Sequence, residues 1–499
     1  MKASVSLLRR SVATTVAART GIFLFVAYAL VAQGQSGNPG AQPEGLNVSQ
    51  QVVELRALVE KLQARVDQLE KQSEAGQATA GKGNAASASA QAVAPGSSNQ
   101  APPEQAKNSQ LQPAVPAGSP PPGPAAALLQ GTTINLLFDG YYGYNFNHPI
   151  GRVNLLRAYD VSSNAFSINQ AAIVLENAPD PASGKRFGVR LDLQYGQATE
   201  TLQGNPANEP RPEIYRNVFQ AYGTYVFPLG KGLTVDFGKF ASSLGLEGNY
   251  TKDQMNYSRS YWFSYLPFYH MGVRASYKIN DKLAVNYWIV NGTQQTEPFN
   301  GFKDQFAGLT IQPKKTIVWN VNYYLGQEHP DVVFFPNGGV PAGLPTQQGV
   351  PFEPLPNGSH GKLHIFDSYA TWQTTPKLSL ALEGDYVIQR LYSNSSPSHT
   401  AGGAAYMQYQ LTPKLSIGGR AEYLTDRGGL FTGVTEAIKE TTFTTKYAVK
   451  DGFLMLGEWR RDFSNQPYFL TNTLGGFKRE QNTATLGLVW WFGGKQGAW

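Results

Sequence analysis

The sequence contains no cysteine, which excludes disulfide bonds, thiol chemistry and cysteine metal sites. It also contains no apolar run of the roughly eighteen residues that a membrane-spanning helix needs. The longest apolar run covers residues 21–32 and follows four basic residues, a pattern typical of a secretory signal peptide. We therefore assign residues 1–32 to a signal peptide, with cleavage after Ala29 or after Gly34 left open.

Net charge is small once this segment is removed. The whole chain has 41 basic and 35 acidic residues, and residues 1–32 hold four of the basic ones and none of the acidic ones. The mature chain is thus near neutral and has no basic cluster, although the pI of the whole sequence is about 9.1. Without a basic cluster we expect no nucleic-acid partner.

Sequence motifs of hydrolases and nucleotide-binding proteins are also missing. The six histidines occur without a Gly-x-Ser-x-Gly, His-Glu-x-x-His or phosphate-binding glycine motif. His360 and His364 are four residues apart, but on a loop that enters a strand, where this spacing does not place both on one helical face. Glu383 and Asp385 share a strand face, for which a solvated surface is a simpler explanation than catalysis. We expect no catalytic residue, no metal and no cofactor.

From about residue 131 the chain runs in amphipathic stretches of roughly ten residues, the length of a tilted β-strand that crosses a bilayer. In residues 233–238, for example, apolar residues alternate with polar residues or glycine. A soluble β-sandwich or propeller would also have short strands. However, tyrosine and phenylalanine, 26 of each, crowd the predicted strand ends, and the last strand, residues 484–492, ends in aromatics. This placement favours an all-β transmembrane barrel over residues 131–499.

The barrel region divides into about sixteen antiparallel strands. We expect them to begin near Thr132, Phe166, Arg186, Ile214, Leu233, Phe268, Leu283, Phe302, Ile317, Leu363, Leu378, Ala401, Leu415, Glu436, Phe453 and Gln481. Short connections rich in Pro, Gly, Asn and Asp alternate with longer polar ones, notably residues 198–213, 241–267 and 326–361. Bacterial barrels have short periplasmic turns and long external loops, so the pattern also predicts the orientation.

Two further segments precede the barrel. Residues 46–72 predict a short coiled coil, with Val48, Val52, Leu55, Val59, Leu62, Val66 and Leu69 at alternating d and a positions. The alternative is a lone amphipathic helix on the barrel or on a membrane, and the heptads leave the number of strands open. Residues 73–130 are dominated by Ala, Pro, Gly, Ser and Gln, which predicts a disordered linker. With the short turns on the periplasmic side, we expect the coiled coil in the periplasm.

Several stretches of the barrel region resemble one family of bacterial barrels. They are residues 156–160, 166–171 and 190–196, and the longer segment from 237–240 through 248–250 to 266–272. This part of the chain resembles the β-barrel porin-2 (OmpL-like) family of Gram-negative outer-membrane proteins. The resemblance implies an outer-membrane channel, but the family is defined by its barrel, so it implies no solute and no binding residue.

Strand alternation proposes which side chains line the lumen. Bulky apolar residues face lipid, and a lipid-facing Arg or Lys at mid-bilayer costs about 2 to 4 kcal/mol. The polar and charged residues that alternate with the apolar ones therefore face inward. The inward set on this argument is Arg190, Asp192, Gln194, Arg216, Gln220, His270, Arg274, Glu383, Asp385, Arg420, Glu422, Glu458 and Arg460. Because it carries both signs of charge, we expect a wet polar lumen.

Residues 241–267 are the candidate for a constriction. They hold Glu247, Lys252, Asp253 and Arg259 among glycines and aromatics. In general porins, which this barrel resembles in strand number, the loop at this position folds into the pore, and charged rings there select ions by sign. The alternative is an ordinary external loop with solvated charges.

These patterns together predict an outer-membrane porin for passive diffusion of small hydrophilic solutes or ions. One alternative is a structural anchor, tethered to the cell wall or to a periplasmic partner through the coiled coil. A barrel hydrolase is less favoured. The expected partners are outer-membrane lipid and further copies of the chain, a trimer by resemblance to general porins.

Overall fold

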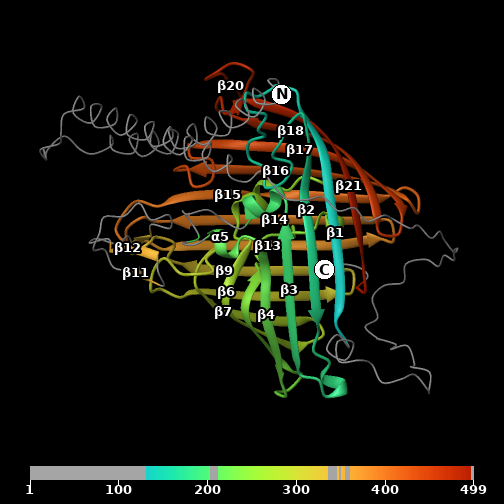
Figure 1. Cartoon of the computed structure of the whole chain (residues 1–499), viewed down its shortest axis with the longest axis vertical. Coiled ribbons are helices and arrows are strands. Elements are labelled where there is room, and N and C mark those ends of the chain that lie inside the picture. The colour runs from blue at the N-terminus through green and yellow to red at the C-terminus, as the bar shows by residue number, and fades with distance from the viewer. Residues whose placement is uncertain are drawn as a thin grey trace, which may run out of the picture. The chain divides into compact units, whose positions relative to one another are not determined.

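The structure is a computed structural model that describes residues 131–202, 209, 212–334, 346–347, 350–354, 360–495 and 499. The predicted signal peptide, coiled coil and linker lie outside these residues. The described part is dominated by antiparallel strands (Figure 1). No helix within it is long and apolar enough to cross a membrane.

Sixteen strands form one closed barrel, which confirms the predicted antiparallel barrel and its strand number. They are β1 (Thr133–Asn145), β2 (Ala165–Asn177), β3 (Phe187–Tyr195), β4 (Val218–Phe227), β5 (Leu233–Ala241), β6 (Tyr269–Asn280), β7 (Leu283–Val290), β8 (Asp304–Lys314), β9 (Ile317–Gly326), β13 (Leu363–Thr375), β14 (Leu378–Gln389), β15 (Ser398–Gln410), β16 (Leu415–Arg427), β17 (Glu436–Lys450), β18 (Phe453–Ser464) and β21 (Glu480–Gly493). Each pairs with its neighbours along the chain, and β21 returns to pair with β1, with Asn135 opposite Gly493 (Figure 1).

The connections at the two ends of the barrel differ in length. At one end β6 and β7, β13 and β14, and β17 and β18 are joined by turns of a few residues, such as 281–282, 376–377 and 451–452. At the other end lie long connections, such as 146–164, 242–268 and 327–362. The short elements outside the barrel wall are η1 (Pro181–Ser183), α4 (Gln197–Leu202), α5 (Pro212–Tyr215), η2 (Thr251–Asp253), α6 (Tyr261–Tyr265), β10 (Val332–Phe334), β11 (Thr346–Gln347), β12 (Val350–Pro354), β19 (Phe469–Leu470) and β20 (Phe477–Lys478).

One predicted strand begins too early. The sequence analysis starts the fourth strand near Ile214, whereas Ile214 lies in α5 and the strand begins at Val218. Pro212 fixes a backbone angle suited to the first turn of a helix, which explains why a helical turn precedes the strand. The other predicted starts lie within three residues of the observed ones.

Side chains alternate between an outer and an inner face of the wall. Outward apolar side chains are exposed in the isolated chain, for example Phe166, Phe237 and Leu486. The inner face is not uniformly polar. A cluster of buried apolar and aromatic side chains, which includes Trp262, Trp288 and Phe306, joins wall strands to the connection between β5 and β6. Part of the interior is therefore packed, and the expectation of a wholly wet, polar lumen is wrong for this part.

Candidate functional site: a segment held inside the barrel

Residues 242–268, between β5 and β6, form what we call the inward segment. Their hydrogen bonds reach wall strands far away in the sequence: Thr251 donates to Asp139 on β1, Leu246 to Glu383 on β14, and Asn256 to Thr444 on β17. The side chains of these partners point inward from three separate parts of the wall. The segment therefore lies within the barrel, as the sequence analysis expects for a constriction.

Two buried arginines anchor the inward segment to the wall strands β16 and β18. Arg420 contacts Glu247 of the segment at 2.9 Å and donates to the carbonyl oxygen of Ser258 at 2.8 Å. Arg460 donates to the carbonyl oxygen of Arg259 at 2.6 Å. Each arginine also pairs with wall carboxylates, among them Glu440 at 2.6 Å from Arg420. Because guanidinium groups have five donors in a fixed plane, they can bind wall and segment at once.

Wall carboxylates bind backbone N–H groups of the same segment. Glu458 accepts from the N–H groups of Tyr257 and Ser258, at 2.6 and 2.9 Å. Glu422 accepts from the N–H of Tyr261 at 2.8 and 3.0 Å, at the start of α6. The backbone N–H groups of a loop buried in a barrel have no neighbouring strand to bind. Here the wall carboxylates accept hydrogen bonds from them instead.

Inward carboxylates of β1 and β3 also bind the segment. Asp139 on β1 accepts from the hydroxyl groups of Thr251 and Tyr257, at 2.6 and 2.8 Å. Asp192 on β3 accepts from the hydroxyl group of Tyr250 at 2.7 Å. The segment is thus bonded to β1 and β3 as well as to β16 and β18, which limits its mobility.

The four charged residues expected at the constriction have different surroundings. Glu247 is bound to Arg420, as described above. Arg259 is fully buried and donates to the carbonyl oxygens of Tyr257, Gly248 and Asn249, within the segment itself. Lys252 pairs with Asp253 at 2.7 Å, its ammonium lies 4.5 Å from the Trp499 ring centre, and burial lowers its pKa.

All but one of the predicted pore-lining residues lie on barrel strands. The exception is Arg216, which precedes β4, is 40% exposed at its side chain and pairs with Glu213. Its assignment to the lumen is a consequence of the misplaced strand start, and we correct it. The residues on β16 and β18 lie against the inward segment and are buried. His270 is buried too, between Gly292 and Ser242.

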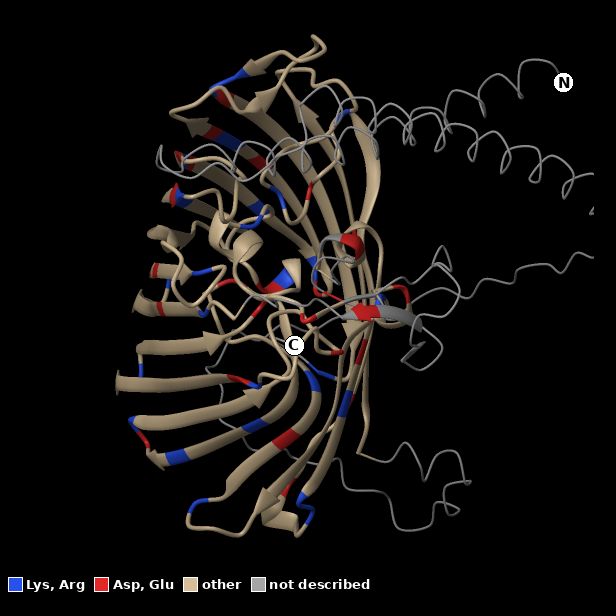
Figure 2. Cartoon of the chain, turned by 90° about the vertical axis from the view of Figure 1, so that its left-hand side faces the viewer, with Lys and Arg blue, Asp and Glu red and all other residues tan. Residues whose placement is uncertain are grey.

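The arginines on β3 and β6 retain more exposure. The side chain of Arg190 is 10% exposed and binds Asp192 through two nitrogens, at 2.8 and 3.0 Å, while that of Arg274 is 19% exposed and binds Asp236 at 2.7 Å. Asp192 in turn accepts from Gln220. Figure 2 shows that acidic and basic residues occur on neighbouring strands of the wall. These two arginines are more exposed than Arg420 and Arg460, which the inward segment covers.

The sequence analysis did not select several residues that matter to this arrangement. Asp462 shares the inward face of β18 with the selected Glu458 and Arg460, and Glu440 and Asp139 are buried on β17 and β1, so strand alternation could have found all three. Arg157 lies in the connection between β1 and β2 and pairs with Asp462 at 2.8 Å. No periodic pattern marks it, because it is not on a strand.

The wall strands β13 and β14 carry a different group. Asp367, Glu383 and Asp385 are 2%, 6% and 5% exposed, and Asp367 lies directly opposite Asp385 in the strand pairing. Glu383 accepts from the N–H of Leu246 at 2.9 Å and from the hydroxyl group of Tyr406 at 2.8 Å. The solvated surface expected for Glu383 and Asp385 is therefore wrong, since both are buried.

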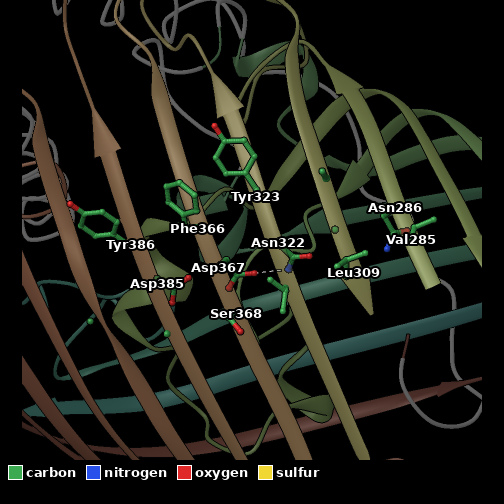
Figure 3. Close-up of a pocket in the computed structure, with 15 residues that line it drawn as sticks. Val285, Asn286, Leu309, Asn322, Tyr323, Phe366, Asp367, Ser368, Asp385 and Tyr386 are labelled. Atoms are coloured by element: carbon green, nitrogen blue, oxygen red, sulfur yellow. Dashed lines mark hydrogen bonds between the residues drawn. The ribbon is translucent and has the colours of Figure 1, made fainter. Parts of the chain in front are cut away.

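A hollow of about 780 Å³ adjoins these strands (Figure 3). Tyr323, Phe366 and Tyr386 form one row across β9, β13 and β14 at its edge. Phe366 and Tyr386 are 46% and 41% exposed and belong to the outward set, whereas Asp367 belongs to the inward set. We assign this hollow to the outer face of the wall and not to the lumen.

Comparisons with known proteins agree with this architecture. The sequence model of the family described as "Putative beta-barrel porin-2, OmpL-like" matches residues 131–492, more than half of the chain. The chain belongs to this family. The resemblance noted in the sequence is confirmed, and the chain is an outer-membrane β-barrel protein of the porin type. No curated protein sequence matched the chain.

Several solved structures have a similar barrel. An anion-selective porin from Comamonas acidovorans has 7% identity and a TM-score of 0.48, with 72% of this chain and 99% of that chain covered. The outer-membrane channel DcaP of Acinetobacter baumannii has 9% identity and a TM-score of 0.45, with 72% and 97% covered. OprB of Pseudomonas putida has 13% identity and a TM-score of 0.44, with 74% and 96% covered. These likenesses concern the fold alone.

Proposed function

We propose that the chain forms a water-filled channel in the outer membrane for passive diffusion of small hydrophilic solutes or ions. The observation that carries this proposal is the inward segment, a long connection bonded inside a closed sixteen-strand barrel. Barrels of this size have room for an aqueous lumen beside such a segment. The segment narrows the lumen, and the arginines on β3 and β6 act on the ions that pass.

In this proposal only some of the predicted pore-lining residues face the channel. Arg190, Asp192 and Arg274 belong to the channel side, because the arginines keep some exposure. Arg420, Glu422, Glu458 and Arg460 hold the inward segment in place. Glu247 and Arg259 of the inward segment are bound to protein groups. They therefore influence the channel chiefly by holding the segment in position, and not by direct contact with ions.

Conductance of the refolded protein in a planar bilayer tests the channel. We expect discrete conductance steps, a measurable ion selectivity and exclusion of sugars above a size limit. Folded protein that inserts into the bilayer without conducting would contradict the proposal. It would favour the anchor, in which the barrel only fixes the N-terminal segments to the membrane.

We further propose that residues 46–72 assemble copies of the chain on the periplasmic side. The support for this proposal is the heptad pattern of the sequence. Deletion of residues 46–72 should lower the apparent mass of the detergent-solubilised protein, measured by light scattering, from an oligomer to a monomer. Full-length protein of monomer mass would contradict assembly, and an oligomer that survives the deletion would place the contacts in the barrel.

A further inference from the structure

The three carboxylates of β13 and β14 lie where unbalanced negative charge would be costly. One oxygen from each of Asp367, Glu383 and Asp385 can be chosen so that all three lie within 4.8 Å of one another. Within the described part of the chain, no Lys or Arg nitrogen lies within 4.0 Å of any of them. Three buried carboxylates at such distances repel one another strongly, unless a cation or shared protons lie among them.

Asp385 points into this group without a hydrogen-bond donor. Both of its carboxylate oxygens are buried and have no hydrogen-bond donor outside this group, and one oxygen of Asp367 is in the same state. The other oxygen of Asp367 accepts from the Asn322 amide at 2.6 Å. The buried carboxylate of Asp304 on β8, in contrast, accepts from Tyr324 at 2.6 Å and from the N–H of Gln327 at 3.1 Å. An unsatisfied buried carboxylate beside two others offers a cation the oxygen ligands that it needs.

We propose that Asp367, Glu383 and Asp385 bind a Ca²⁺ ion. Hard oxygen donors suit Ca²⁺ and Mg²⁺ and not the softer transition metals. Ca²⁺–oxygen distances of about 2.3–2.6 Å allow two ligands on one ion to lie up to roughly 5 Å apart, which covers this group. Mg²⁺ demands nearly ideal octahedral geometry, and three side chains on two adjacent strands do not provide it.

The site lies at the beginning of the inward segment. Glu383 binds the N–H of Leu246, and the Asn322 amide that donates to Asp367 also donates to the carbonyl oxygen of Ser243 at 3.2 Å. A bound Ca²⁺ would thus hold the first residues of the segment against β13 and β14. Arg420 and Arg460 hold the later residues against β16 and β18 in the same way.

Ca²⁺ binding by the full-length protein in detergent tests the proposal. After treatment with EDTA, equilibrium dialysis with Ca²⁺ should show one bound ion per chain, with Mg²⁺ a weak competitor. Ca²⁺ should also raise the melting temperature of the treated protein. No stoichiometric binding, or tighter binding of Mg²⁺, would overturn the assignment, and in the first case shared protons would account for the group.

Variants locate the ion. Asp385→Asn and Asp367→Asn keep the shape of the side chain and remove one charge, and each should weaken Ca²⁺ binding at least tenfold. Each should also melt higher than the wild type in EDTA, because the repulsion is reduced. Asp304→Asn is the matched control and should bind Ca²⁺ as the wild type does. Unchanged binding by folded Asp385→Asn protein would overturn the proposal. These measurements do not require conduction, so their failure and that of the channel proposal are separate results.

Discussion

Two parts of the wall that hold the inward segment, a first flank of β16–β18 and a second flank of β13 and β14, balance charge in different ways. On β16–β18, Arg420 and Arg460 lie among Glu422, Glu440 and Asp462, and both arginines also bind carbonyl oxygens of the segment. On β13 and β14 the inward charges are all negative. We therefore expect protein cations to fix the inward segment at β16–β18 and, under the Ca²⁺ proposal, a cation from solution to fix it at β13 and β14.

The largest expected effect comes from breaking the first flank. Arg420→Ala removes one partner of a buried network and leaves Glu247 and Glu440 without this cation, which should destabilise the barrel by about 3–5 kcal/mol. The inward segment should loosen, so that single-channel current becomes noisier and larger. Melting in detergent and bilayer recording measure the two effects.

Arg461→Ala is the matched control for that variant. Arg461 is one residue from Arg460 but is 52% exposed at its side chain and pairs with the half-exposed Glu480. Exposed ion pairs contribute about 0–1 kcal/mol. Equal melting temperatures for the Arg420 and Arg461 variants would contradict the anchoring role of Arg420.

A smaller effect is expected away from both flanks. Neutralising Arg190 and Arg274 together with glutamine should shift the reversal potential toward cations, because Asp192 and Asp236 then lose their cationic partners. Arg216→Gln should not change the selectivity, because Arg216 lies outside the strand and is exposed. An unchanged reversal potential in the double variant, or an equal shift in the Arg216 variant, would contradict this lining.

The smallest effect concerns pH at Asp160, whose neighbour Arg157 pairs with Asp462 of the first flank. Asp160, in the connection between β1 and β2, lies 3.4 Å from Arg157, and burial raises the pKa of its carboxyl to about 6. The folded state therefore holds this proton more tightly than the unfolded state, and the stability contributed is present at low pH and is lost as pH rises through about 6. Asp160→Asn should reduce the fall in melting temperature between pH 4.5 and 7.5. The exposed Asp331→Asn is the control, and an identical pH dependence in both variants would contradict the shift.

Strand alternation in the sequence predicted much of the wall and little of what fills it. It placed Arg420, Glu422, Glu458 and Arg460 on inward faces, since a period of two is visible in any strand. It could not show that the inward segment covers them, because these contacts join residues more than 150 positions apart and leave no local pattern.

Local irregularities caused the other differences. Arg216 was misplaced because a helical turn precedes β4. On β2, a bulge turns both Asn169 and Gln170 inward, which simple alternation cannot anticipate. Glu383 and Asp385 on β14 were placed on one face, but their burial depends on the first residues of the inward segment, which only the folded barrel brings there.

The pairing of β1 with β21 has a consequence for biogenesis. Asn135 and Gly493 are neighbours in the sheet, so the first strand must wait for the last one to be synthesised before its second edge is covered. Until then both terminal strands present unpaired N–H and C=O groups, which are templates for aggregation. An open intermediate of this kind would need protection during export, because its two edges are unpaired. The final step of assembly would be the pairing of β1, which is synthesised early, with β21, which is synthesised last.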